Sequence, residues 1–423
     1  LSASLVGSEM CIRDRSWRDY MIERPLYMKK IAPFMDAPLA KIITGIRRSG
    51  KSTILEMVEK RLQERGVPKE KIFYAKFDSY EYEWIDSGSK LYHAISEKLD
   101  GDGYYLLLDE VQEIEGWEKA VNSLMASKNA NVFITGSNSK LMSSEISTYL
   151  SGRYVVIPVY PLSFAEYIEF RKSVGEDKAN NDFLRDYIRM GGFPAVAVSN
   201  FTQQEAYTVV RDIYTSVIYN DITKRSKIRK IDQFERLVKF MFENIGKTFS
   251  AQSVSDYMKS EKRSLDIETI YNYINQLKKA YILYEANRYD VRGKEALKTQ
   301  EKYYLADPSL KYAVMGFYDT SISSMLENIV FLELLRRGYE TYVGTWNGKE
   351  IDFVGVLRDE KVYIQVCRHI PEDEKGRDRE IGNLLKIKDN YPKYVVTLDE
   401  YAGSNEDGVR IVYLADFLLR ENW

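Results

Sequence analysis

The segment "GIRRSGKST" at residues 45–53 constrains the fold of this 423-residue chain more than any other stretch. Glycines let the backbone turn so that successive N–H groups point inward at an anion, and the lysine adds a positive charge. The apolar run "LAKIITG" before it predicts a buried strand, and "STILEMVEKRLQERG" after it predicts a helix. A phosphate-binding loop between strand and helix predicts an α/β nucleotide-binding fold.

The rest of the chain shows three kinds of pattern. Apolar runs at 71–78, 104–110, 131–137 and 153–159 predict further strands, with helical patterns at 92–99 and 117–127 between them. This alternation predicts a parallel, doubly wound sheet. Helical patterns continue from about 163 to 245, and strand-like runs return from 303. We therefore predict an α/β part, a helical part and a smaller α/β part.

The amino-acid composition excludes several kinds of functional site. The chain has two cysteines, Cys11 and Cys367, and two histidines, which are too few for a disulfide framework, a Cys/His zinc site or a Ser-His-Asp triad. A metal would need oxygen ligands, which favours Mg²⁺. The chain has no apolar run of membrane-spanning length, so we expect a cytoplasmic protein with no membrane contact. Residues 1–15 resemble translated sequencing-adapter read-through and are left out of the fold prediction.

Several polar residues follow the predicted strands. Lys51 is expected near the β- and γ-phosphates and Ser52 on Mg²⁺, with Asp109, at the end of "YYLLLDE", as the second Mg²⁺ ligand. Glu110 is positioned to orient or deprotonate a water that attacks the γ-phosphate, which favours hydrolysis over transfer to a small molecule. Asn138 is a candidate for contact with the γ-phosphate or that water. Arg153 is a candidate for stabilising charge, within its own subunit or in a neighbouring one.

The motifs together resemble a bacterial and archaeal group of AAA-type, STAND-like ATPases with a C-terminal domain of unassigned role. The likeness rests on "GIRRSGKST", "LLLDEVQEIEGWE", "ITGSNSKLMS", "LSGRYVVIPVYPLSFAEY" and "GGFPAV". It implies a Walker B pair at Asp109 and Glu110, a sensor at Asn138 and a lid element at residues 191–194. It also implies that ATP is bound by Gly45, Ile46, Arg47, Arg48, Ser49, Gly50, Lys51, Ser52 and Thr53.

Residues 231–302 have the pattern of a winged helix. Three predicted helices are followed by a hairpin through "DVRGKE", the expected wing. On the third helix, Ile267 and Ile270 are expected to face the core. The opposite face carries candidate DNA contacts, namely Thr269, Asn272, Gln276 and Lys279. Residues 221–302 hold 18 Lys and Arg against 12 Asp and Glu, which suits DNA but also a solvated protein-docking module.

The last part has the layout of PD-(D/E)XK nucleases, in which two carboxylates hold Mg²⁺ and a lysine positions the attacking water. Glu327 and Asp352 match the two acids. Gln365 stands where an acid belongs and Cys367 where the lysine belongs. We therefore expect a nuclease fold with a degraded site and no cleavage. The predicted domains are a P-loop ATPase core at 16–162, a helical lid at 163–230, the winged helix at 231–302 and the nuclease-like domain at 303–423.

The leading interpretation is an Mg²⁺-dependent ATPase that works as a conformational switch or motor on DNA or a DNA-bound partner. One alternative is an ATP-gated protein-interaction scaffold in regulation or defence that binds no nucleic acid. A second alternative is an ATP-dependent nuclease. Homo-oligomerisation is compatible with each of these, because Arg153 would also serve a neighbouring subunit.

Overall fold

The computed structural model describes the residues 21–137, 148–226, 228, 230–293, 295–400 and 403–423. Within these residues the chain divides into two compact units. Most of the first unit is Gly50–Gly136, and the second contains Thr44–Ser49 together with Pro158–Trp423. Residues 1–15 and Asn138 lie outside the described residues.

A parallel sheet forms the centre of the nucleotide-binding part. In the described residues its strand order is β2-β3-β4-β1-β5, and β2, β3 and β4 pair in parallel. The strands are β1 (Ala40–Thr44), β2 (Ile72–Lys76), β3 (Tyr105–Asp109), β4 (Asn131–Gly136) and β5 (Tyr154–Pro158). The connections from β1 to β2, from β2 to β3 and from β3 to β4 each pass through a helix, and this confirms the predicted α/β fold.

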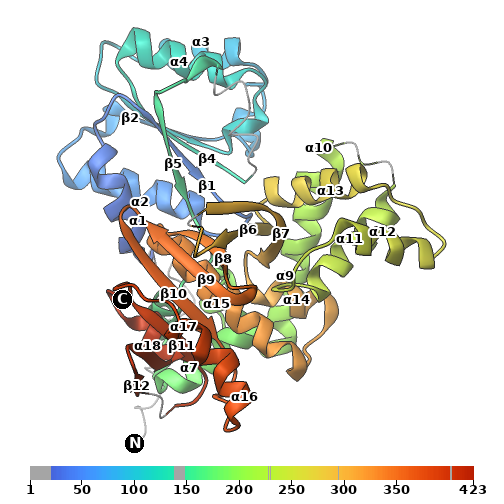
Figure 1. The fold of residues 1–423 in the computed structure, drawn as a ribbon. Helices are drawn as coiled ribbons and strands as arrows, with labels where there is room; N and C mark the ends of the chain where they lie inside the picture. Colours follow the sequence, from blue (N-terminus) through green and yellow to red (C-terminus); the bar gives the residue numbers. More distant parts are fainter. Residues whose placement is uncertain (1–20, 138–147, 227, 229, 294, 401–402) are drawn as a thin grey trace, which may run out of the picture. The chain divides into compact units, whose positions relative to one another are not determined.

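Helices cover both faces of this sheet (Figure 1). They are α1 (Pro25–Ile31), α2 (Lys51–Glu64), α3 (Gly88–Ser96) and α4 (Trp117–Lys128). The apolar residues that set the helical period of α2, including Ile54, Leu55, Val58 and Leu62, are fully buried. Burial on both faces explains why β3 is largely apolar in sequence and why every residue of β1 is buried.

The region after β5 is helical, as predicted. It contains α6 (Phe164–Ser173), α7 (Asn180–Met190), α8 (Pro194–Ala197), α9 (Gln203–Ser216), a π-helical segment (Val217–Thr223) and α10 (Lys224–Ser226). Ser163 caps α6, because its hydroxyl accepts a hydrogen bond from Glu166 N while the Glu166 carboxylate accepts one from Ser163 N. This reciprocal pair satisfies two otherwise unpaired N–H groups at the helix start.

Three helices and a hairpin follow, in the predicted order. They are α11 (Ile231–Glu243), α12 (Ala251–Ser260), α13 (Ile267–Lys279), β6 (Leu283–Asp290) and β7 (Glu295–Leu305). Ser250 and Asp266 cap α12 and α13. The expectation that Ile267 faces the core is wrong: its side chain is 44% exposed, because it lies at the first turn of α13, whereas Ile270 is buried.

The hairpin is not a free wing. β6 pairs in parallel with β8 (Glu340–Trp346), so the hairpin forms one edge of the sheet of the C-terminal region. In the described residues this sheet has the order β12-β13-β11-β10-β9-β8-β6-β7. The remaining strands are β9 (Lys349–Leu357), β10 (Glu360–Val366), β11 (Lys393–Thr397), β12 (Asn405–Glu406) and β13 (Val409–Tyr413).

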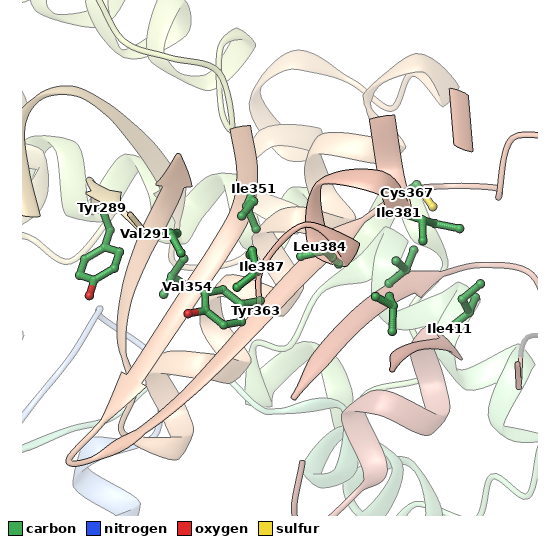
Figure 2. Close-up of a cluster of buried hydrophobic side chains, with 12 residues drawn as sticks. Tyr289, Val291, Ile351, Val354, Tyr363, Cys367, Ile381, Leu384, Ile387 and Ile411 are labelled. Carbon is green, nitrogen blue, oxygen red and sulfur yellow. The ribbon is translucent and has the colours of Figure 1, made fainter. Parts of the chain in front are cut away.

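Helices flank the C-terminal sheet. They are α14 (Pro308–Met315), α15 (Ile322–Arg337), α16 (Glu374–Arg377), α17 (Asn383–Leu385) and α18 (Leu414–Leu419). A cluster of buried apolar side chains holds β9, β10, β11, β13 and α17 together, with Ile351, Val354, Tyr363, Leu384 and Ile411 among its members (Figure 2).

Candidate functional site

The phosphate-binding loop leads directly into α2. Gly50 is the N-cap of this helix and has φ +96°, a left-handed conformation that glycine adopts without steric cost. Lys51 and Ser52 then form the first turn, so the helix N-terminus and its partial positive charge lie at the end of the loop. Lys51 is 4% exposed, which keeps its ammonium in a partly desolvated place.

Asp109 is the centre of a small hydrogen-bonded group at the ends of β3 and β4. The Ser52 hydroxyl donates to Asp109 Oδ1 over 3.1 Å, and the Thr135 hydroxyl also donates to Oδ1. Burial raises the pKa of Asp109, while the hydrogen bonds from Thr135 and Ser52 offset part of that rise. The parallel strands bring these side chains together, because residues at the carboxyl ends of neighbouring strands share one edge of the sheet.

Glu110 follows in a special backbone conformation. Its φ is +53°, a left-handed value that costs a residue with a Cβ about 1–2 kcal/mol. Its N–H donates to the Thr135 hydroxyl over 3.0 Å, and its carboxylate accepts a hydrogen bond from Gln112. Thr135 therefore fixes both acids, and sequence reasoning missed it. The signal was a polar residue inside the apolar run "NVFITGS".

The remaining residues of interest for nucleotide binding lie in different surroundings. Arg153 lies immediately before β5, with an exposed side chain. Asn138 is outside the described residues, but Ser137 beside it is 1% exposed. Arg47 forms a bidentate ion pair with Asp221 in the π-helical segment, with its Nε and Nη2 each 3.1 Å from a carboxylate oxygen. Sequence reasoning gave no indication of this pair.

The four candidate DNA contacts on α13 are not equivalent. Asn272 and Lys279 are exposed. Thr269 is half-buried, and its hydroxyl donates to the N-capping Asp266 over 2.8 Å. The Gln276 Oε1 accepts a hydrogen bond from the Ser226 hydroxyl in α10 over 2.7 Å. Two of the four side chains are therefore already engaged within the chain.

The nuclease-like residues lie on the elements expected of them. Glu327 is on α15, Asp352 on β9 and Gln365 on β10, with Cys367 directly after β10. Gln365 accepts a hydrogen bond from Asp352 N over 3.3 Å and donates one to Glu380 over 3.0 Å. Cys367 belongs to the same apolar cluster as Ile381 (Figure 2).

Three charged residues join this group that sequence reasoning missed, namely Lys302, Glu350 and Glu380. Glu350 could have been found, because it lies two residues before Asp352 and thus on the same side of β9. Burial lowers the pKa of Lys302, but the nearby carboxylates of Glu327, Asp352 and Glu350 outweigh it and leave that pKa above its ordinary value.

Burial shifts the pKa of the two acids upward, whereas it shifts that of Lys302 downward. Burial raises the pKa of Glu327, and the charge of Asp352 raises it further. Burial also raises the pKa of Asp352, although Lys302 and the N–H of Val366 oppose the change. Across the described part of the chain, no group of three or more His, Cys, Asp and Glu side chains is arranged to hold a metal ion. None of the helices described is both long and apolar enough to cross a membrane.

Comparison with known proteins places these features in context. Residues 38–168 match the model of a family described as an AAA domain, and residues 181–321 match a domain of unknown function. An "uncharacterized protein" of Haemophilus influenzae is 38% identical over 402 residues, covering 95% of this chain and 99% of that protein. A second uncharacterized protein, from Methanocaldococcus jannaschii, is 28% identical over 80% of this chain and 76% of its own length.

A solved structure resembles this fold. The Walker-type ATPase of Pyrococcus abyssi aligns with a TM-score of 0.50 at 15% identity, covering 70% of this chain and 97% of that one. At this identity the likeness supports the fold alone. It agrees with the parallel sheet described above.

Proposed function

The chain belongs to a family of AAA-domain P-loop ATPases, and from this premise we propose that residues 45–53 bind ATP and that Asp109 and Glu110 support its hydrolysis. The observation that carries the proposal is the direct hydrogen bond between Ser52 and Asp109, 57 residues apart, at the start of α2. A hydroxyl and a carboxylate at a helix N-terminus form the ligand pair that a triphosphate with Mg²⁺ requires.

Ser52 and Asp109 suit Mg²⁺, because both side chains offer oxygen as a ligand and neither offers nitrogen or sulfur. Ser52 and Asp109 would hold the ion, which would offset charge on the phosphates. The Lys51 ammonium neutralises the β- and γ-phosphates, and its burial strengthens that attraction relative to water. The backbone N–H groups of the loop bind phosphate oxygens and orient the chain of phosphates for in-line attack.

Glu110 acts on the water. In the proposed mechanism its carboxylate accepts a proton from a water aligned with the γ-phosphate. The hydrogen bond from Gln112 and the one between Glu110 N and Thr135 restrict where that carboxylate can lie. Asn138 would steady the same water or the γ-phosphate. Exposed Arg153 is accessible to a neighbouring subunit, so we propose that it acts between copies of the chain.

Nucleotide binding is tested with Lys51→Ala. Isothermal titration with ATP and Mg²⁺ should show no binding, because the charge that complements the triphosphate is lost. Lys60→Ala is the matched control: the same helix carries this lysine with a side chain 52% exposed, and its replacement should leave the affinity unchanged. Unchanged affinity in a folded Lys51→Ala protein would contradict the proposal.

We further propose that ATP turnover acts on DNA or on a DNA-bound partner through the exposed side of α13. The support is the excess of basic residues in 221–302 and the exposure of Asn272 and Lys279. Because Thr269 and Gln276 are engaged within the chain, the expected contact is mainly with phosphates and has low sequence preference.

A salt-dependent gel shift separates this proposal from its alternatives. Lys279→Glu should weaken binding to duplex DNA and lower the salt dependence, because a phosphate contact becomes repulsive. Lys90→Glu, on α3, makes the same charge change at another exposed position and should have no effect. If the parent protein does not bind DNA at low salt, the ATP-gated protein-interaction scaffold replaces this proposal.

A further inference from the structure

Lys302 lies buried among carboxylates in the C-terminal region. Its side chain is 4% exposed, and its Nζ lies 2.6 Å from Glu350 Oε1 and 3.6 Å from Glu327 Oε2. Asp352, which is 6% exposed, also acts on Lys302 through its charge. We call Lys302, Glu327, Glu350 and Asp352 the Lys302 cluster.

Each acid of the cluster has a further hydrogen-bond donor. Tyr304 donates to Glu327 Oε2 over 3.4 Å, and the Val366 N–H donates to Asp352 Oδ2 over 2.8 Å. Arg288 Nη2 donates to Glu350 Oε2 over 3.0 Å. The side chains are thus held from several sides, and the ammonium lies where two of the carboxylates converge.

The residues come from distant elements. Lys302 is on β7, Glu327 on α15, and Glu350 and Asp352 are both on β9. Asp352 is buried, the Glu327 side chain is 18% exposed and the Glu350 side chain is 35% exposed. Carboxylates withdrawn from water destabilise a fold unless a cation compensates them. In hydrolytic sites built on such carboxylates, a divalent metal ion supplies that compensation. In this chain the ammonium of Lys302 supplies it.

We propose that Lys302 is a built-in cation that takes the place of a divalent metal ion between Glu327, Glu350 and Asp352, and that removing the ammonium opens a divalent-cation site. The native cluster is therefore expected to be closed to Mg²⁺ and Mn²⁺. The inference rests on this cluster alone and does not depend on how ATP is used.

The test is a Lys302→Met variant of the full chain, titrated with Mn²⁺ without nucleotide. Electron paramagnetic resonance of free Mn²⁺ should show one additional bound ion per chain relative to the parent protein. The melting temperature of the variant should rise by several degrees with Mn²⁺, because the ion binds only the folded state. The parent protein and the variants share the same phosphate-binding loop, so any Mn²⁺ bound at that loop is the same in each titration.

Two control variants make the test specific. Lys393→Met removes another buried lysine of the same sheet, one paired with the single carboxylate of Asp389, and should gain no Mn²⁺ site. Lys302→Met/Asp352→Asn should lose the site that Lys302→Met gains, because one ligand charge is gone.

The possible results are decisive even if the single variant folds poorly. A Lys302→Met protein that regains cooperative unfolding only when Mn²⁺ is added supports the proposal, since the ion then replaces the ammonium. A folded Lys302→Met protein that binds no more Mn²⁺ than the parent contradicts it. So does a parent protein that binds Mn²⁺ at a site abolished by Asp352→Asn, because that site would be open in the presence of Lys302.

Discussion

Arg47 and Asp221 form a bidentate ion pair although 174 residues separate them in the chain. The Asp221 side chain is fully buried, and that of Arg47 is 33% exposed. The pair joins the segment just before the N-terminus of α2 to the π-helical segment Val217–Thr223. A buried carboxylate of this kind depends on its cation, because desolvation would otherwise make the charge costly.

A double-mutant cycle with Arg47→Met and Asp221→Asn measures this dependence. We expect a coupling free energy of about 1–3 kcal/mol in chemical unfolding, because one partner is buried and the geometry is bidentate. The Arg65–Asp36 pair is the control: both of its side chains are about half exposed, and its coupling should stay below about 1 kcal/mol. Equal coupling in the two cycles would show that burial of Asp221 adds nothing.

Glu110→Gln should keep ATP bound while turnover stops. The amide retains the shape of the side chain but cannot accept the proton, and Ser52 and Asp109 are untouched. The measurement combines an ATP titration with a phosphate-release assay, in which we expect a loss of about a hundredfold or more. Glu113→Gln, which changes an acid three residues away, should hydrolyse ATP at the parent rate. Parent-rate turnover in Glu110→Gln would place the base elsewhere.

The strand–loop–helix of the nucleotide site could be predicted because its signals are local. The apolar run of β1, the glycines of the loop and the helical period of α2 lie within about 25 residues. Helix N-caps such as Ser163, Ser250 and Asp266 are local signals of the same kind, since a cap acts on the three residues that follow it. Architecture that depends on local hydrogen bonding is visible in the sequence.

Pairings between distant residues were not visible. Nothing around Lys302 indicates that it faces Glu327 and Glu350, because the contact is set by how β7 and β9 meet α15. The hydrogen bond from Ser226 to Gln276 could not be predicted from the sequence for the same reason. Helical periodicity separates a buried face from an exposed one, but it cannot show that a short helix such as α10 contacts part of the exposed face.

Gly191→Ala should be far more destabilising than Gly175→Ala. Both glycines have left-handed φ, +76° and +91°, so both substitutions carry backbone strain. A Cβ on Gly191 would lie 1.9 Å from Asp307 Oδ1, whereas one on Gly175 meets nothing within 4 Å. The buried Asp307 also accepts hydrogen bonds from Gly192 N and Ser309 N, so it cannot move freely. We expect an extra cost of roughly 1–3 kcal/mol in urea unfolding; equal costs would contradict the close contact.

The protein should not cleave linear, supercoiled or single-stranded DNA with Mg²⁺ or Mn²⁺, with or without ATP. Gln365 lacks the charge to hold a metal ion, and its amide is committed to Asp352 and Glu380. Cys367 cannot act as an ammonium. Agarose and denaturing gels provide the measurement, with a commercial nuclease as the positive control. Cleavage that disappears in Asp352→Ala would overturn this prediction.

Cys367 should resist alkylation in the folded protein. Burial, together with the charge of Glu380, raises the pKa of its thiol to about 12. Iodoacetamide reacts with the thiolate. At pH 8.5 a thiol with this pKa is ionised in only about one molecule in a thousand or fewer.

The measurement is alkylation with iodoacetamide at pH 8.5, followed by peptide mass spectrometry. Cys367 should stay unmodified in the native protein and be fully modified in 6 M guanidinium, a concentration on the order of that needed to unfold stable domains. Following the Cys367 peptide separately excludes any signal from Cys11. The same peptide should become more reactive in Ile381→Ala, because removing an apolar side chain from the cluster that buries Cys367 loosens its packing. Rapid native alkylation of Cys367 in the parent protein would mean that the thiol is open to solvent, and the apolar cluster around it would have to be redrawn.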